Sequence, residues 1–137
     1  MDPKRPRQKM KADQGQALVE FALAISLLLI LIVGMMEFGL VFHTYLSLDH
    51  AALEGARVGA LGGSDEAIID KVHEVVSADV DSQYLQVKIT PQSSIRRRSQ
   101  PLAVTVEYPS DFLSPLLNNI LGEGKLHLKA KAVMRIE

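Results

Sequence analysis

An uncharged apolar run constrains this chain more than any other feature of its sequence. From Phe21 to Met36 the residues read FALAISLLLILIVGMM, without a formal charge. With residues 17–19 included, and Glu20 placed near the interface, the run approaches the roughly 20 residues that a helix needs to cross a bilayer. We therefore expect a membrane-spanning helix in this part of the chain.

A secretory signal peptide is the competing interpretation of an apolar run near the N-terminus. The apolar region of a signal peptide is usually shorter, and it ends at an Ala-x-Ala-like cleavage site. Here the run continues into residues 34–39, GMMEFG, and no cleavage site of that kind follows. The sequence therefore favours a helix that is retained.

The charges are unevenly spread along the 137 residues. Residues 1–15 hold five basic and two acidic side chains, a net charge of +3, which leaves −4 for the rest of a chain whose total is −1. Basic residues that flank a membrane helix stay on the cytoplasmic side. We expect a single-pass protein of the cytoplasmic (inner) membrane, with its N-terminus inside and its C-terminal part outside.

Composition argues against several classes of function. The chain has no tryptophan and few aromatic residues, which argues against nucleic-acid binding by base stacking. It also has no cysteine, so disulfides, zinc fingers, iron–sulfur clusters and thiol nucleophiles are excluded. A small exterior domain must then be held together by packing alone.

The helix is expected to continue beyond the membrane, because residues 40–61 lack proline and are rich in Leu and Ala. We predict one long helix over residues 16–61, in which Glu54 and Arg57 pair across one turn. Small residues recur along it and could let another element approach closely. Alternatively, the glycines simply loosen the end of the helix, each at about 1 kcal/mol relative to Ala. The small residues are Ala51, Gly55, Gly59 and Gly63, with Ala52, Ala56 and Ala60 beside them.

A second helix is predicted after a break at Gly62-Gly63-Ser64. Ser64 is a suitable N-cap, and the acidic residues Asp65 and Glu66 follow in the first turn, where the helix dipole favours them. Apolar residues then recur at helical spacing to about Val80. This pattern is typical of an amphipathic helix with one buried face.

Three runs with strand-like alternation follow, at residues 85–89, 102–108 and 126–136. Alternation of this kind indicates a sheet with one buried and one solvated face. We predict an α+β fold: a three-stranded antiparallel sheet backed by helix 65–80, its core completed by the distal end of the long helix. The expected organisation is a basic leader at 1–15, the long helix at 16–61 and an exterior αβββ domain at 62–137.

The segment between the last two strands carries an apolar patch that is either a short covering helix or an exposed contact surface. Its members are Phe112, Leu113, Leu116, Leu117, Ile120 and Leu121.

No constellation of catalytic or metal-binding residues is evident. The four histidines, His43, His50, His73 and His127, are scattered, although His43 and His50 share one helix face. No phosphate loop, nucleophile elbow or carboxylate pair occurs. We therefore expect no enzyme activity, no metal and no cofactor. The polar loop at residues 91–101 contains three consecutive arginines, Arg96, Arg97 and Arg98. They are either a solvated run of charges or a contact for phosphate or lipid.

Glu20 is the ionisable residue that asks for an explanation, because charge is expensive in a bilayer. It could simply reach the interface or lie outside the membrane. Alternatively, cleavage between Gly15 and Gln16 would make Glu20 the fifth residue of the product and Phe21 the sixth. The new α-amine of Gln16 would then be a cation at the membrane, and Glu20 of an adjacent subunit could neutralise it as helices pack.

Four segments, in order, resemble the TadE-like pseudopilins, minor pilin-like proteins of the tight adherence (Tad) type IVb pilus system. Residues 15–23 resemble a type IVb prepilin processing site. The residues Glu37, Phe38 and Gly39 match the family's Glu-Phe-Gly element, and residues 51–57, which include Glu54, Gly55 and Arg57, are similar to its Ala-Ala-x-Glu-Gly-Ala-Arg element. Residues 132–137 resemble its final strand.

The resemblance implies cleavage between Gly15 and Gln16 by a prepilin peptidase. It also implies a partner pseudopilin, Flp-type pilins, the Tad inner-membrane platform and a role in initiating or priming an adhesion pilus. A major pilin is a competing hypothesis, but such subunits are usually much shorter after the helix. An uncleaved single-pass anchor with an exterior binding domain is another.

Overall fold

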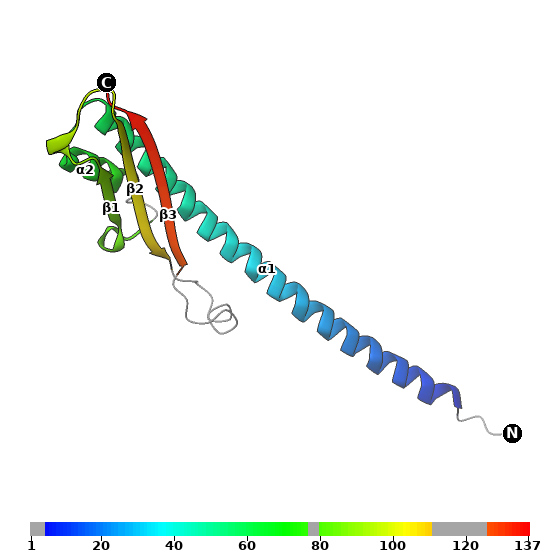
Figure 1. Ribbon diagram of the computed structural model, residues 1–137. Helices are drawn as coiled ribbons and strands as arrows, with labels where there is room; N and C mark the ends of the chain where they lie inside the picture. The colour runs from blue at the N-terminus through cyan, green and yellow to red at the C-terminus, as the bar shows by residue number, and fades with distance from the viewer. Residues whose placement is uncertain (1–4, 77–79, 111–125) are drawn as a thin grey trace. The chain divides into compact units, whose positions relative to one another are not determined.

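The computed structural model describes residues 5–76, 80–110 and 126–137, with side chains from residue 15 onward in the first of these ranges. The chain forms two compact units, Met1–Met36 and Glu37–Glu137. Its elements are a long helix, a short helix and a three-stranded sheet (Figure 1), so the predicted α+β class is confirmed.

Helix α1 spans Arg5–Ala60 and thus begins ahead of the predicted start at Gln16. Pro6 does not prevent this early start, because a proline in the first turn lacks an N–H that would be unpaired there anyway. Within the first unit every residue from 15 to 32 is exposed. A helix that is apolar on all sides needs a non-aqueous environment or a protein cover.

Among the residues that the structure describes, one helical stretch is long and apolar enough to cross a membrane. It runs from Gly15 to Ala60, and its most apolar window has a mean hydropathy of 2.7. The predicted apolar helix is therefore confirmed, and it is consistent with a single-pass membrane anchor.

The end of α1 is set by the predicted glycine pair. Gly62 has a φ of +89°, a left-handed conformation that glycine adopts without steric cost. Its N–H donates to the carbonyl of Gly59 at 3.1 Å, and the N–H of Gly63 donates to the carbonyl of Val58 at 3.0 Å. This pair of hydrogen bonds is a Schellman motif, which satisfies carbonyls that the helix end leaves free.

Helix α2, Asp65–Val76, begins as its sequence predicts. The Ser64 hydroxyl accepts a hydrogen bond from the N–H of Ala67 at 3.2 Å, which confirms Ser64 as the N-cap. The buried residues Ile68, Val72 and Val76 recur every four positions and form the inner face of the helix. Residues 77–79, the end of the predicted helix, lie outside the described part of the chain.

The sheet is antiparallel with strand order β1-β2-β3, as predicted. Short 3₁₀ turns precede and follow the first strand, η1 at Ser82–Tyr84 and η2 at Ser93–Ile95. The strands are β1 at Gln86–Thr90, β2 at Pro101–Ser110 and β3 at Leu126–Arg135. Alternate residues along β2 and β3 are buried, and the predicted inner faces are the observed ones. The apolar patch predicted within residues 109–125 falls on residues 111–125, outside the described residues.

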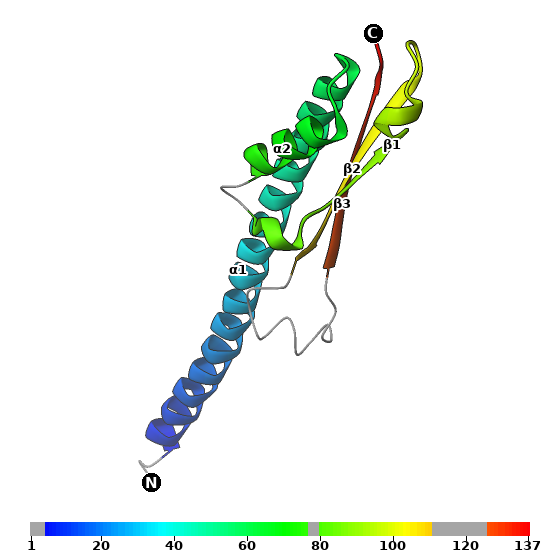
Figure 2. The same ribbon diagram turned by 90° about the vertical axis from the view of Figure 1, so that its left-hand side faces the viewer.

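Both helices of the second unit lie on the same side of the sheet (Figure 2). The distal part of α1 contributes buried side chains to the core, so the expectation that it completes the small domain is confirmed. The fully buried large side chains are Leu48, Ile68, Val72, Val76, Leu102, Val104 and Val106.

The glycines of α1 permit close packing of neighbouring elements. A Cβ atom at Gly55 would lie 2.7 Å from Val72 Cγ2, and one at Gly59 would lie 2.7 Å from Ile68 Cδ1 and collide with Leu102 Cδ2. Real Cβ atoms do not approach other atoms so closely. Of the two interpretations of the small residues, close approach is therefore confirmed, and the approaching elements are α2 and β2 of the same chain.

The loop between β1 and β2 is fastened to the start of α2. Arg96, whose side chain is only 9% exposed, pairs with the Asp65 carboxylate. Its guanidinium also donates to the carbonyls of Gly63 at 2.7 Å and Pro91 at 3.1 Å. Arg97 and Arg98 are exposed. The three arginines are therefore not one solvated charge run, because Arg96 is half-buried and holds the loop to the start of α2.

Candidate functional site

The predicted processing segment lies on an exposed part of α1. Gly15, Gln16, Glu20 and Phe21 are all exposed, and all belong to the first unit. The side-chain amide of Gln16 donates to Glu20 Oε1 at 3.1 Å, across one helical turn. The structure thus places the side chains of Gln16 and Glu20 side by side within one chain, whereas the predicted pair joins Gln16 to Glu20 of an adjacent subunit.

The peptide bond between Gly15 and Gln16 lies within helix α1. A protease binds its substrate in an extended form, so this turn must unwind before the bond can be cut. Glycine lowers the cost of unwinding, since it is about 1 kcal/mol less favourable than Ala in a helix interior. Among the described residues, none packs against Gly15, because a Cβ placed there would meet no atom within 4 Å.

The Glu-Phe-Gly element places a carboxylate and an aromatic ring in contrasting surroundings. Glu37 is 6% exposed and is the buried charged residue among those described, whereas Phe38 is 70% exposed. The Phe38 ring stacks on Phe42, with centroids 6.0 Å apart and planes inclined by 11°. A Cβ atom at Gly39 would meet nothing within 4 Å, so the small size of this glycine serves no packing contact within the described chain.

The second family element lies where α1 enters the core. Glu54 and Arg57 approach to 3.5 Å across one turn, which confirms their predicted pairing. Both groups are substantially exposed, and an ion pair of this kind contributes only a few tenths of a kcal/mol. Gly55 lies beneath α2 and has a structural role, because a side chain there would meet Val72.

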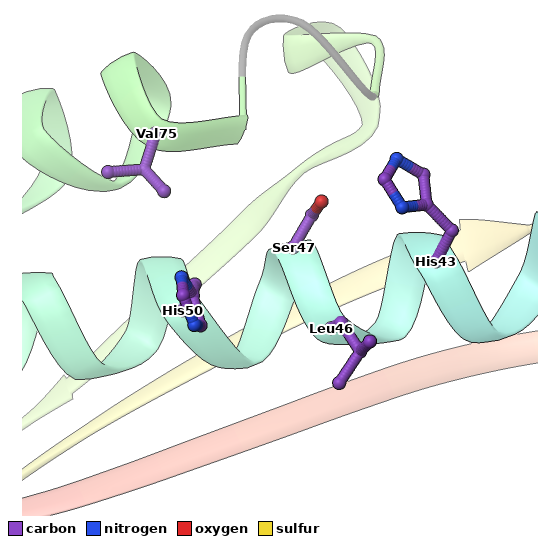
Figure 3. A pocket seen from close by; sticks show the side chains of 5 residues that line it. All are labelled: His43, Leu46, Ser47, His50 and Val75. Carbon is purple, nitrogen blue, oxygen red and sulfur yellow. The ribbon is translucent and has the colours of Figure 1, made fainter.

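His43 and His50 line one open hollow of about 340 Å³ on the predicted common face of α1. Figure 3 shows Val75 entering this region from α2, with Ser47 lying between the two histidines along α1. Leu46 completes the lining residues that the structure describes. The described lining residues of this hollow include no carboxylate.

A second hollow of about 530 Å³ lies at the far end of the second unit, where α1, the β1–β2 loop and the C-terminal residues meet. Arg97 and Arg98 line it together with the acidic Glu137. Arg96, which also lines it, is already occupied by Asp65 and two backbone carbonyls. In the parts of the chain that the structure describes, no three His, Asp or Glu side chains group as metal ligands.

A comparison with protein-family models found a match to one part of the chain. Residues 15–57 match the family described as TadE-like protein.

Residues 15–57 are TadE-like.

The match confirms the resemblance for the first three of its four segments, whereas residues 132–137 lie outside the matched range. The TadE-like segment begins at Gly15, the residue before the predicted cleavage, and ends at Arg57, the last residue of the second family element. Searches of curated proteins and of solved structures gave no match.

The TadE-like segment leaves most of the exterior domain uncovered, and there the structure shows contacts that the sequence did not predict. Asp65 carries two interactions: it pairs with Arg96 and accepts from the Ser93 N–H at 3.1 Å. On the sheet, Glu107 bridges Lys88 and Lys129. Strand alternation placed Glu107 on the solvated face, but its partners depend on strand register, which the sequence alone did not give.

Proposed function

We propose that this chain is a TadE-like pseudopilin, or minor pilin, that takes part in initiating or priming a Tad type IVb adhesion pilus after cleavage by a prepilin peptidase. The observation that carries the proposal is an apolar helix exposed on all sides over residues 15–32, which bears Glu20 and lies in the TadE-like segment. Its partners are another Tad pseudopilin, Flp-type pilins, the Tad inner-membrane platform and membrane lipid.

Processing is hydrolysis of the Gly15–Gln16 bond. Water adds across the amide, leaving a carboxylate on Gly15 and an α-amine on Gln16. The amine becomes protonated, and it then lies at the membrane interface beside the apolar run. Glu20, which accepts a hydrogen bond from the Gln16 side chain in the uncut chain, is the carboxylate suited to neutralise such a cation.

The neutralising Glu20 is proposed to come from an adjacent subunit. Glu20 and Gln16 of the same chain are one helical turn apart. A pair within one chain would therefore form whether or not subunits pack, and it would not favour packing. A pair between subunits removes two charges from the apolar surroundings only when helices associate. Processing would thereby make helix packing favourable only for cleaved chains.

The charge distribution supports one orientation of the anchor. The basic residues before Gly15 lie on the cytoplasmic side of the inner membrane, where the peptidase would remove them, and the second unit lies outside. The Glu-Phe-Gly element and the element at residues 51–57 then lie beyond the apolar run. Phe38 and Phe42, which are exposed and stacked, lie just beyond its end.

The first test is the N-terminal residue of the protein made in its native cell, determined by intact mass and N-terminal peptide mapping. We expect the chain to begin at Gln16. A Gly15→Leu variant should remain uncut, whereas Gly34→Leu, which also adds a side chain at an open position of α1, should be cut normally. A wild-type chain that still begins near Met1, with an active peptidase in the same cell, would overturn the proposal and favour a plain single-pass anchor.

The role of Glu20 is tested separately from cleavage. Glu20→Gln keeps the size and hydrogen-bonding capacity of the side chain but removes its charge. We expect this variant to be processed and yet to lose pilus formation, whereas Asp49→Asn, at an exposed carboxylate of the same helix outside the family elements, should retain it. Normal piliation of the Glu20→Gln variant would exclude the proposed charge pairing while leaving the processing step intact.

A further inference from the structure

The outer face of the sheet is basic. Because side chains alternate across a strand, the residues opposite to the buried ones gather on this face. Four cations lie there, all exposed, and we call them the basic face: Lys88 on β1 and Lys129, Lys131 and Arg135 on β3. In the strand pairing Thr105 lies between Lys88 and Lys131, and Glu107 lies beside Lys129.

Glu107 neutralises only part of this charge. Its carboxylate pairs with Lys129 Nζ at 2.9 Å and with Lys88 Nζ at 3.2 Å. These two lysines hold the pKa of Glu107 below its ordinary value, with the Lys129 hydrogen bond as the largest cause. Glu107 therefore stays ionised near neutral pH, and four cations against one carboxylate leave the basic face with a charge of +3.

The second unit carries acidic residues on a different side. Glu66, Asp70 and Glu74 are exposed at intervals of four residues along α2, and we call them the acidic stripe. The buried residues of α2 face the core, so the acidic stripe points away from the sheet. Figure 2 shows α2 on the side of the sheet opposite to the bare outer face. Within the stripe, Lys71 pairs with Glu74 at 3.0 Å.

The spacings of the two surfaces agree. Lys129 and Lys131 are two residues apart on a strand, which separates their Cα atoms by about 6.8 Å along it. Asp70 and Glu74 are four residues apart on a helix, which separates theirs by about 6 Å. A helix laid along β3 would thus bring successive acids of the stripe opposite successive lysines of the face.

We propose that the acidic stripe of one copy of this protein docks on the basic face of a second copy. The contact joins two different surfaces, so each copy keeps one free stripe and one free face. Interfaces of this kind build open chains or closed rings instead of stopping at a pair. Exposed ion pairs are individually weak and are screened by salt, so the association is weak in dilute solution and falls with ionic strength.

A second copy of the chain accounts for both charged surfaces better than an anionic membrane does as the partner of the basic face. An anionic membrane would engage the basic face alone, and it would leave the acidic stripe and its matching spacing without a role. It would also repel Glu107, which lies among the lysines. A copy of the chain supplies both charged surfaces at once. This inference concerns the second unit and does not depend on cleavage after Gly15.

The experiment is a charge swap in the full-length protein, held in detergent micelles and followed by sedimentation velocity at low and high salt. We expect concentration-dependent association of the wild type at low salt that is lost at high salt. The face variant Lys129→Glu/Lys131→Glu and the stripe variant Asp70→Lys/Glu74→Lys should each lose it, because each then opposes like charges. Mixing the two variants should restore association to near the wild-type extent.

Two controls make the outcome decisive. Arg97→Glu/Arg98→Glu changes the net charge as much as the face variant does but alters an exposed loop, and it should associate normally. Circular dichroism of each variant should match the wild type. A wild type that stays monomeric at low salt, or a mixture that stays monomeric, would overturn the proposal. If instead only binding to vesicles containing phosphatidylglycerol falls in the face variant, the basic face contacts lipid and the proposal is wrong.

Discussion

The two halves of α1 show how one helix can meet two different surroundings. Over residues 15–36 large aliphatic side chains point in every direction, and nearly all are exposed. Over residues 37–60 the buried positions are concentrated on one side and are mostly small, with Ala51, Ala52 and Ala56 fully buried. Secondary structure is the same in both halves. The difference therefore lies in what each half is built to contact.

Size and distribution of side chains explain the difference. Bulky residues on all sides offer no close approach to a protein neighbour, but they suit lipid tails, which conform to any shape. Small residues on one side let α2 and β2 reach the helix backbone, and dispersion contacts accumulate there. The first half thus needs an apolar solvent, whereas the second half is covered by α2 and β2 of the same chain.

The most severe way to test this contrast is a pair of identical truncations. Leu48 is fully buried and Leu28 is 52% exposed, and both lie on α1. Leu48→Ala should lower the free energy of unfolding of the second unit by about 3 kcal/mol, through lost burial and a residual cavity. Leu28→Ala should leave that unfolding transition unchanged. Denaturant titration in detergent measures both, and equal losses in the two variants would contradict the contrast.

A charge placed in each half separates membrane insertion from folding. Leu28→Arg should weaken insertion by about 3 kcal/mol, the cost of an arginine at the centre of a membrane helix. Leu53→Arg, at a residue that is 46% exposed in the second half, should insert normally. An insertion assay with the full chain compares the two. Normal insertion of the Leu28→Arg chain would mean that residues 21–36 do not span the membrane.

Glycine substitutions give a smaller effect that should differ between the halves. Gly59→Ala should destabilise the second unit by about 2 kcal/mol, because its methyl group collides with buried side chains of Ile68 and Leu102. Gly34→Ala meets no atom within 4 Å, and it should not lower stability, since Ala favours the helix. Thermal unfolding of both variants is the measurement. A neutral Gly59→Ala would show that the core yields more easily than its packing indicates.

The smallest expected effect is the pH dependence from Glu107. Its pKa is lowered in the folded protein from an ordinary value of 4.5, so the folded state holds the ionised form more tightly than the unfolded state does. The resulting stabilisation is fully present above pH 4.5 and is lost as the pH falls through the lowered value. Thermal unfolding from pH 7 to pH 3 should show a shallower loss in Glu107→Gln, and an identical slope would remove Glu107 as a contributor.

Much of the fold could be predicted because its signals are local. Periodicity gave the inner faces of α2, β2 and β3, the Ser64 hydroxyl marked the start of α2, and the glycine pair at 62–63 marked the end of α1. The small residues of α1 left two interpretations open. Local sequence could not choose between them, because the atoms that fill the space above Gly55 and Gly59 belong to residues far along the chain.

For the candidate site, the sequence predicted which residues belong to it but not how they are buried. Family resemblance supplied the residues from Gly15 to Arg57, and the family match covers the same range. The burial of Glu37 beside an exposed Phe38 could not be predicted from the spacing of residues along the helix, because it depends on what packs against that turn. The same is true of Arg96, which sits in a run of three arginines and differs from the other two only through its contact with Asp65.

The placement of β3 has a consequence for the order of assembly. Leu128, Ala130 and Ala132 of β3 are buried in the core, Ile136 is buried beside them, and the Glu137 N–H donates to the carbonyl of Ala60 at 3.0 Å. The end of α1 is made much earlier in synthesis than these residues, whereas β2 comes shortly before them. Closing so long a loop is slow. A nascent chain therefore exposes apolar core surface of the exterior domain until β3 has been synthesised. During that interval a chaperone or a partner protein can bind the exposed surface.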